Sequence, residues 1–99
     1  MPPGSDDEQF IQSWVRVEAF LADYKPDIFI LQAGADSIAG DPITHMAYSP
    51  VSHAYATDRL CKLAGRSARG RLLVLGGGGY NRDNLAHAWC AVAESFLAN

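Results

Sequence analysis

Hydrophobic residues are spaced in two different ways along the chain, and the spacing predicts alternating helices and strands. The stretches 27–32 ("DIFILQ") and 72–75 ("LLVL") are continuous apolar runs, which are typical of strands buried on both faces of a parallel sheet. Between and around these runs, helical spacing over 51–63 and 85–96 predicts two amphipathic helices. A further helix is predicted before the first strand by a stripe of Phe10, Trp14, Val17, Leu21 and Tyr24, which Ile11 and Val15 widen.

Capping residues and prolines set the predicted ends of the first two helices. Ser5 and Glu8 fit a capping box at the start of the first helix. Pro26 ends that helix, because the residue before a proline avoids the helical conformation. The dipeptide 49–50 (Ser-Pro) offers an N-cap and a first-turn proline for the second helix, and Gly65 offers a C-cap.

The predicted order is helix, strand, helix, strand, helix, which is the order of a βαβ unit with a parallel sheet. To bury two strands on both faces, a domain needs more strands and helices than are predicted for this chain. A two-stranded parallel sheet is also not expected to be stable alone. We therefore interpret residues 1–99 as a single partial α/β domain. Either the chain is part of a larger domain, or a homo-oligomer covers its sheet edges.

Composition narrows the class of protein further. Hydrophobic residues make up 48% and charged residues 19% of the 99 residues, an ordinary globular balance. A net charge of −3 argues against nucleic acid or an anionic membrane as partner, since both require a basic patch. No apolar run approaches the roughly 20 residues of a membrane helix, and the first residues are polar and acidic rather than a signal sequence. We expect a cytoplasmic protein whose two cysteines are reduced and mostly buried.

Four consecutive glycines end the second predicted strand and lead directly into Tyr80. A dinucleotide fingerprint requires a third glycine, but its position falls on Asn81 or Arg82. A P-loop requires a lysine followed by serine or threonine after its last glycine, and neither is present. The sequence therefore disfavours nucleotide binding, and so many glycines indicate instead that another group approaches the backbone closely.

Polar residues follow both predicted strands, at the edge of the sheet where ligands of open α/β folds bind. "AGADSIAGDP" follows the first strand and "GGGGY" the second, so Asp36, Asp41 and Tyr80 are expected at one rim. For Asp36 the alternatives are a metal ligand, a general base or a loop cap; for Asp41, which precedes a proline, a turn is favoured. Three histidines lack metal-ligand spacing and are interpreted as surface or structural residues: His45, His53 and His87.

Taken together, these motifs resemble the C-terminal part of the zinc-dependent histone deacetylase superfamily. The resemblance is carried by "LQAGADSIAGDP" (31–42), "LVLGGGGYN" (73–81) and "NLAHAW" (84–89), and extends to "PPGSDDEQF" near the start. It covers essentially all 99 residues and is greatest to the bacterial deacetylases of the acetoin-utilisation type. It implies an arginase-like three-layer fold with a parallel sheet, of which this chain holds an incomplete βαβ portion.

The resemblance also implies roles for particular residues. Asp36 corresponds to one of the family's zinc ligands, and Tyr80 to the tyrosine that stabilises the oxyanion while water attacks an N-acetyl amide. Gly78 corresponds to the narrow wall of the tunnel for the acyl-lysine, and Ile43 to a residue at the tunnel mouth. The implied substrates are acetyl-lysine or acetylpolyamines, and the implied cofactor is zinc, which polarises the amide carbonyl and activates water.

Other parts of the family's active site have no counterpart in this sequence. There is no Asp-x-His segment, which supplies the other two zinc ligands, and no adjacent pair of histidines, which supplies the general base. A catalytic zinc site needs about three protein ligands, so Asp36 alone would bind zinc weakly. We expect this chain to be inactive by itself as a fragment or truncated homologue of a deacetylase; the alternative is a non-catalytic oligomeric module derived from the same fold.

Overall fold

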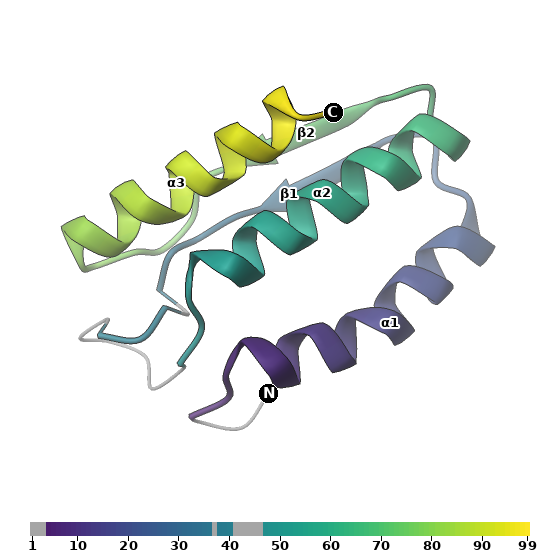
Figure 1. Cartoon of the computed structure of the whole chain (residues 1–99). Helices are drawn as coiled ribbons and strands as arrows, with labels where there is room; N and C mark the ends of the chain where they lie inside the picture. Colours follow the sequence, from purple (N-terminus) through teal and green to yellow (C-terminus); the bar gives the residue numbers. More distant parts are fainter. Residues whose placement is uncertain (1–3, 37, 41–46) are drawn as a thin grey trace.

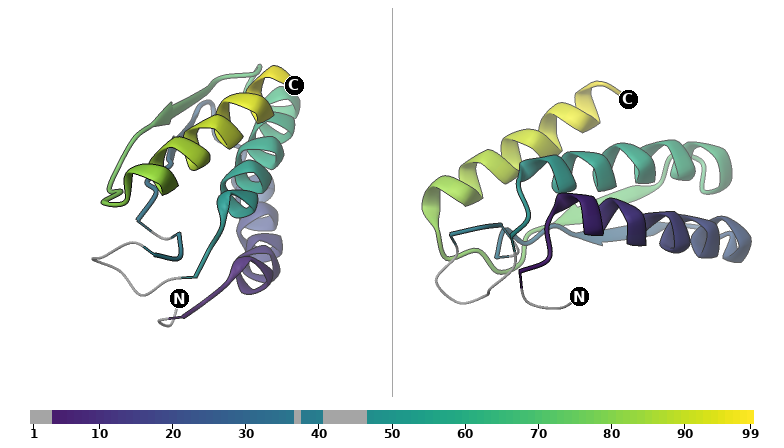
Figure 2. Two further views of the ribbon diagram at one scale, coloured as in Figure 1. Left: turned by 60° about the vertical axis from the view of Figure 1, so that its left-hand side comes forward. Right: turned by 60° about the horizontal axis from the view of Figure 1, so that its bottom comes forward.

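The structure is a computed structural model that describes residues 4–36, 38–40 and 47–99. Figure 1 shows that the helices lie together on one side of a small sheet, and Figure 2 shows the same layering from two further directions. In chain order, the elements formed by the described residues are α1 (Asp7–Tyr24), β1 (Phe29–Gln32), α2 (Pro50–Ser67), β2 (Leu72–Leu75) and α3 (Arg82–Leu97).

The two strands are parallel neighbours, and α2 is the helix that connects them. The register places Phe29 opposite Leu72 and Gln32 opposite Leu75. This arrangement confirms the predicted βαβ unit. Because the strands are parallel, their C-terminal ends reach the same edge of the sheet and deliver the segments that follow them, from Ala33 and from Gly76, to one place.

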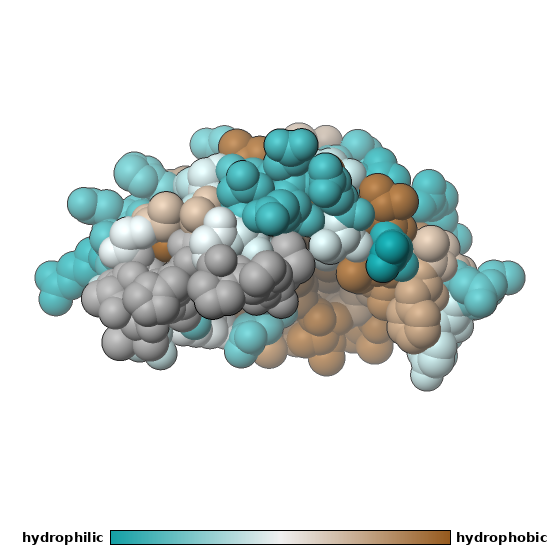
Figure 3. All heavy atoms as spheres, turned by 90° about the horizontal axis from the view of Figure 1, so that it is seen from below, coloured by the Kyte–Doolittle hydropathy of each residue, from teal (hydrophilic) through white to brown (hydrophobic). Residues whose placement is uncertain are grey.

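One face of the sheet packs on the helices, and the other face is open. Phe29 is buried in a cluster with residues of α1 and α2, among them Trp14, Leu60 and Leu63. On the opposite face, Ile30 is 63% exposed and its partner in β2, Leu73, is 48% exposed. The described residues alone do not form the two-sided burial predicted for a complete domain, because all the helices that they form lie on one side of the sheet. Brown, apolar residues gather along the middle of the lower edge of Figure 3.

The helix ends differ in detail from the sequence prediction. The capping box at α1 is formed by Asp6 and Gln9, one residue later than predicted, whereas Ser5 is buried and its carbonyl oxygen accepts a hydrogen bond from the Ala47 amide. The predicted start of α2 is confirmed, since the Ser49 side chain accepts from the Val51 amide. The other end is wrong: α2 continues past Gly65 to Ser67.

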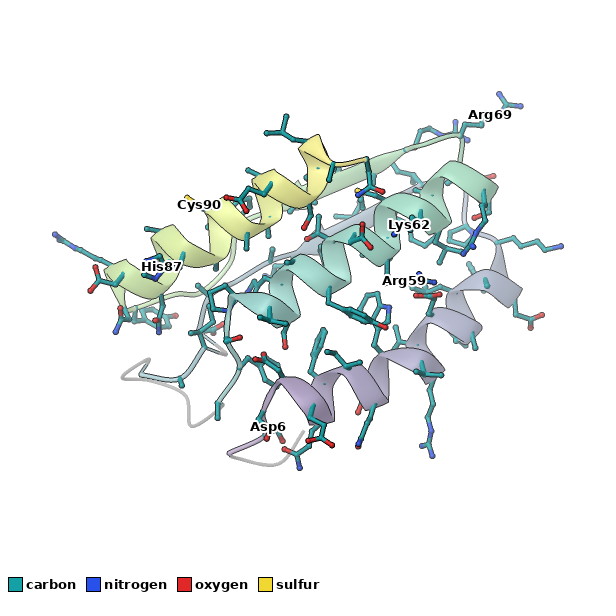
Figure 4. The ribbon with its side chains drawn as sticks, in the orientation of Figure 1. Asp6, Arg59, Lys62, Arg69, His87 and Cys90 are labelled. Carbon is teal, nitrogen blue, oxygen red and sulfur yellow. The ribbon has the colours of Figure 1, made fainter. Side chains whose placement is uncertain are left out.

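An ion pair between Arg59 and Glu18 joins α2 to α1, and a hydrogen bond within α1 supports the Glu18 carboxylate. Arg59 Nε donates to Glu18 Oε1 at 2.7 Å and its Nη2 to Oε2 at 2.5 Å, while the Trp14 indole donates to the same carboxylate at 3.0 Å. Figure 4 shows Arg59 reaching from α2 towards α1. Hydrogen bonding from Arg59 is the main reason why the pKa of Glu18 lies below its ordinary value.

The cysteines are less buried than predicted. Cys61 in α2 is half-buried, and burial raises the pKa of its thiol. Cys90 is exposed on α3, so the expectation of mostly buried thiols is wrong for this residue. None of the helices in the described part of the chain has the length and apolar character needed to cross a membrane.

Candidate active site

The candidate active site lies where the segments after β1 and β2 meet. The strand pairing continues past the last β1 residue, because the Ala33 amide donates to the Leu75 carbonyl at 2.8 Å. One step further, the Ala35 amide donates to the Gly78 carbonyl at 2.7 Å. The backbone before Asp36 is thereby fixed directly to the glycine segment.

A side chain would be crowded on both sides of this contact, by backbone atoms at Gly34 and by the Asp36 side chain at Gly78. A Cβ atom on Gly34 would lie 3.0 Å from both the N and the O of Gly78. A Cβ atom on Gly78 would lie 2.5 Å from Asp36 Oδ2 and 2.8 Å from its Cγ. The half-buried Asp36 carboxylate therefore occupies the volume that a side chain at position 78 would fill. This is the close approach that the run of glycines predicted, and the approaching group is Asp36.

Tyr80 is held at the same edge by its two neighbours. Before it, Gly79 has a φ of +153°, and a Cβ there would lie 3.1 Å from Ala35 Cβ. After it, Asn81 caps α3 by accepting a hydrogen bond from the Asn84 amide at 3.1 Å. The Tyr80 side chain is 57% exposed, so this edge of the sheet presents its ring to the surroundings.

The start of α3 also binds the loop that follows Asp36. Asn81 Nδ2 donates to the Gly40 carbonyl at 3.3 Å, and Asn84 Nδ2 donates to the Ala39 carbonyl at 2.9 Å. The two motifs, separated by the whole of α2, are therefore joined at several points. The Asn81 side chain caps α3 and also binds the loop after Asp36, and the Asn84 side chain binds the same loop. These hydrogen bonds hold the backbone near Asp36 close to the backbone near Tyr80.

Several predicted residues are not part of this arrangement. Asp41, Ile43 and His45 lie outside the described residues. His87 is exposed on α3, where Figure 4 labels it. Across residues 4–36, 38–40 and 47–99, no three His, Cys, Asp or Glu side chains come together that could hold a metal ion. Within that part of the chain, Asp36 is the predicted ligand that the structure brings against the glycine segment.

Sequence reasoning missed His53, which lies directly behind the Asp36 segment. Its Nε2 is 2.8 Å from the Gly34 carbonyl oxygen. Its Nδ1 is buried and has no hydrogen-bond partner among the described residues. The ring also lines a cavity of about 160 Å³ whose other walls include Phe10, Trp14, Leu31 and Tyr48. Position 53 follows the predicted N-cap by one helical turn, and the crossover helix of a βαβ unit starts near the C-terminal end of the first strand. The sequence could therefore have indicated that His53 lies close to the segment after that strand.

The end of α2 that carries His53 is anchored by Asp7 of α1. Asp7 Oδ1 accepts from the Ser49 amide at 2.8 Å and from Ser52 Oγ at 2.5 Å, and Oδ2 accepts from the Ser49 hydroxyl. Partial burial raises the pKa of Asp7, but these hydrogen bonds together lower it by more, so the pKa lies below its ordinary value. The ionised carboxylate thus stabilises the fold at neutral pH.

Replacing Asp7 with asparagine is expected to lower the free energy of unfolding by about 1–2 kcal/mol at pH 7. In the unchanged chain, a carboxylate with a lowered folded-state pKa contributes stability above the unfolded pKa of about 3.9, and this contribution is lost as the pH falls through the folded value. Urea unfolding at pH 7 and at pH 3 measures both effects. The control is Asp27→Asn, at an exposed loop residue; equal losses in the two variants would contradict the role of Asp7.

The fold and the site together define a class: a parallel α/β unit whose paired strand ends bring a Gly-Ala-Asp segment against a glycine run that leads into tyrosine. The histone deacetylase domain matches residues 1–96, and the chain belongs to this family. It is 39% identical over 89 residues to histone deacetylase 6 of Arabidopsis thaliana, covering 88% of this chain and 18% of that protein. It is 34% identical over 95 residues to histone deacetylase clr3 of Schizosaccharomyces pombe, covering 95% and 13%.

Solved structures agree with this assignment. The structure of the histone deacetylase Clr3 matches 98% of this chain with a TM-score of 0.87 and 30% identity, and the HD domain of HDA15 matches 99% with a TM-score of 0.86 and 27% identity. The predicted deacetylase-like fold is confirmed. The chain spans only 16% and 27% of these two structures. The similarity to bacterial acetoin-utilisation deacetylases stays a prediction, since the two relatives named above are from a plant and a fungus.

Proposed function

We propose that this chain is the part of a zinc-dependent deacetylase that carries one metal ligand and the oxyanion donor. Asp36 supplies the ligand, Tyr80 the donor, Gly78 the wall beside the metal, and Ile43 a side chain at the mouth of the substrate tunnel. The substrates are N-acetyl amides, of the acetyl-lysine or acetylpolyamine type. The observation that supports this proposal is the seating of the Asp36 carboxylate against Gly78, where a Cβ would lie 2.5 Å from Oδ2.

The chemistry of the residues fits this division of roles. When bound, zinc supplies Lewis-acid activation of a carbonyl and of water, and a carboxylate is a suitable ligand for it. Asp36 would hold the metal through its oxygens, with its backbone fixed by the Ala35–Gly78 hydrogen bond. The Tyr80 hydroxyl would donate a hydrogen bond to the oxygen on which negative charge develops. The bare backbone at Gly78 leaves room beside the carboxylate.

We further propose that the chain alone has no deacetylase activity. A catalytic zinc site uses about three protein ligands, and the described residues bring no such group together. Deacetylase activity would therefore require the remaining zinc ligands and the histidine base to be supplied by polypeptide other than these 99 residues. We also propose a cytoplasmic location, where cysteines stay reduced, in keeping with the free Cys61 and Cys90 of this chain.

Two assays test the proposed function. The isolated chain with zinc and an acetyl-lysine reporter is expected to show no turnover; turnover abolished by Tyr80→Phe would contradict the proposed inactivity. In the second assay, this chain replaces the matching segment of Clr3, whose structure it matches with a TM-score of 0.87. We call this hybrid the Clr3 graft. It is expected to turn over the reporter, to lose activity with a chelator and to regain it with zinc. A folded, inactive graft would contradict the roles assigned to Asp36 and Tyr80.

The open face of the sheet supports a second candidate function, a non-catalytic oligomeric module. Ile28, Ile30, Leu73 and Leu75 are each at least 48% exposed, and contiguous exposed apolar surface marks an interaction site. A second copy of the chain would cover this face and the strand edges. Size-exclusion chromatography with light scattering distinguishes the two candidates: a folded dimer or larger oligomer supports the module, and a poorly folded or aggregating monomer supports the deacetylase fragment.

A further inference from the structure

We propose that His53 is a positioning residue for the Asp36 segment, an inference that rests on the proposed metal role of Asp36. His53 lies in the first turn of α2. Its Nε2 is 2.8 Å from the Gly34 carbonyl oxygen, two residues before Asp36. It therefore acts through the backbone of Gly34.

The hydrogen bond defines the tautomer of the ring. A carbonyl oxygen only accepts, so Nε2 must carry the proton that is donated to Gly34. Nδ1 is buried and has no partner among the described residues. A proton on Nδ1 would leave a buried donor unsatisfied, which is costly, whereas an acceptor lone pair is more readily tolerated there. The structure thus assigns the proton to Nε2 and directs it at the backbone that leads to Asp36.

The histidine itself is rigidly placed, as a positioning residue must be. Thr57 is fully buried, and its hydroxyl donates to the His53 carbonyl at 2.8 Å. The preceding Ser52, also fully buried, donates to Asp7 at 2.5 Å. The backbone that carries the ring is therefore held by α1 and by the body of α2.

Gly34 is a point where backbone support is effective, because it lies between two fixed neighbours. The Ala33 amide donates to Leu75 and the Ala35 amide to Gly78, at 2.8 and 2.7 Å. With the Gly34 carbonyl held by His53, the peptide group between Gly34 and Ala35 is anchored from both sides, and the peptide group that carries the Ala33 amide is anchored to Leu75. This leaves little freedom for the Asp36 carboxylate to leave its seat beside Gly78. Outer groups that orient a metal ligand in this way affect metal affinity and activity without touching the metal.

Amide hydrogen exchange of the Clr3 graft, prepared without metal, tests the proposal. The variants are His53→Leu, which removes the donor, and His53→Gln, whose Nε2 amide can still donate to the Gly34 carbonyl. The measured quantity is the exchange rate of the Ala35 amide relative to that of Phe29, which donates to Arg71 at the other end of the sheet at 3.0 Å. His53→Leu is expected to raise this ratio about five- to tenfold, the factor for one lost hydrogen bond, and His53→Gln less than about twofold.

The matched control is His87→Leu, at an exposed histidine of α3, which is expected to leave the ratio unchanged. An unchanged ratio in His53→Leu, or an equal rise in His53→Gln, overturns the proposal. A second measurement needs no variant: the ¹⁵N chemical shifts of the His53 ring report the tautomer. Protonated Nε2 with bare Nδ1 supports the proposal, and a proton on Nδ1 overturns it even if His53→Leu does not fold.

A zinc titration of the same samples separates this inference from the proposed function. Zinc-dependent shifts of the Asp36 and Gly78 resonances are expected in the unchanged Clr3 graft, which holds the remaining ligands, and are expected to vanish in its Asp36→Asn variant. If Asp36→Asn keeps them, or if they are absent throughout, the metal role of Asp36 fails. The exchange ratio then still decides whether His53 holds the Gly34 carbonyl.

Discussion

Replacing Tyr80 with phenylalanine in the Clr3 graft is expected to lower kcat by about 10²–10³-fold, the usual effect of removing one oxyanion donor. The substitution removes only the hydroxyl and keeps the ring between Gly79 and Asn81. The hydroxyl would form its hydrogen bond chiefly when negative charge develops on the carbonyl oxygen, so KM is expected to change little. Steady-state kinetics with an acetyl-lysine reporter measure kcat and KM separately.

The control for this variant is Tyr24→Phe. Tyr24 is 73% exposed near the end of α1, where its ring stacks with Phe20 and would continue to do so as phenylalanine. It is expected to leave both constants unchanged. A loss of less than about threefold in Tyr80→Phe, or a loss confined to KM, would mean that the hydroxyl does not stabilise the transition state and would contradict the proposed function.

The order and type of the elements could be predicted because local pattern determines them. Continuous apolar runs specified both strands, and the Ser49-Pro50 pair specified the start of α2. Tertiary contacts changed the details. Gly65 has open space around a Cβ and does not end the helix; Gly70 has the left-handed φ of +75°, and its amide donates to the Ala64 carbonyl. Pattern alone does not determine which of two glycines takes that conformation.

From the sequence, the strand order predicted which segments form the candidate site but not which residues are in contact there. Parallel strands bring their C-terminal ends together, so the meeting of the Asp36 segment with the glycines followed from the predicted βαβ order. The pairing of Gly78 with Asp36 did not follow, because it depends on the register of the irregular segments beyond the strands. His53 was interpreted as a surface or structural histidine, since a single histidine without spaced partners carries no metal signal. Its role depends on where the first turns of α2 lie, which no spacing in the sequence specifies.

Replacing Gly78 with alanine is expected to lower kcat/KM of the Clr3 graft by about 10²-fold, because it displaces the proposed metal ligand. The φ of Gly78 is outside the left-handed region, so the backbone itself accepts alanine. The obstacle is the Asp36 carboxylate, whose Oδ2 would lie 2.5 Å from the new Cβ. Misplacement of a catalytic group by about 1 Å costs about this factor. The same variant is expected to weaken zinc binding, measured by competition with a chelator.

Gly76→Ala is the matched control, because it adds the same methyl group to the same glycine run. There a Cβ would lie 3.5 Å from the Trp89 ring, an ordinary contact, so activity and zinc affinity are expected to stay within about twofold. Equal losses in the two variants would indicate that the run as a whole tolerates no side chain, and the specific role of Gly78 would be wrong. A loss in Gly78→Ala alone would show that the absence of a side chain at this position makes room for the Asp36 carboxylate. The glycine run would then be needed for the position of the proposed metal ligand.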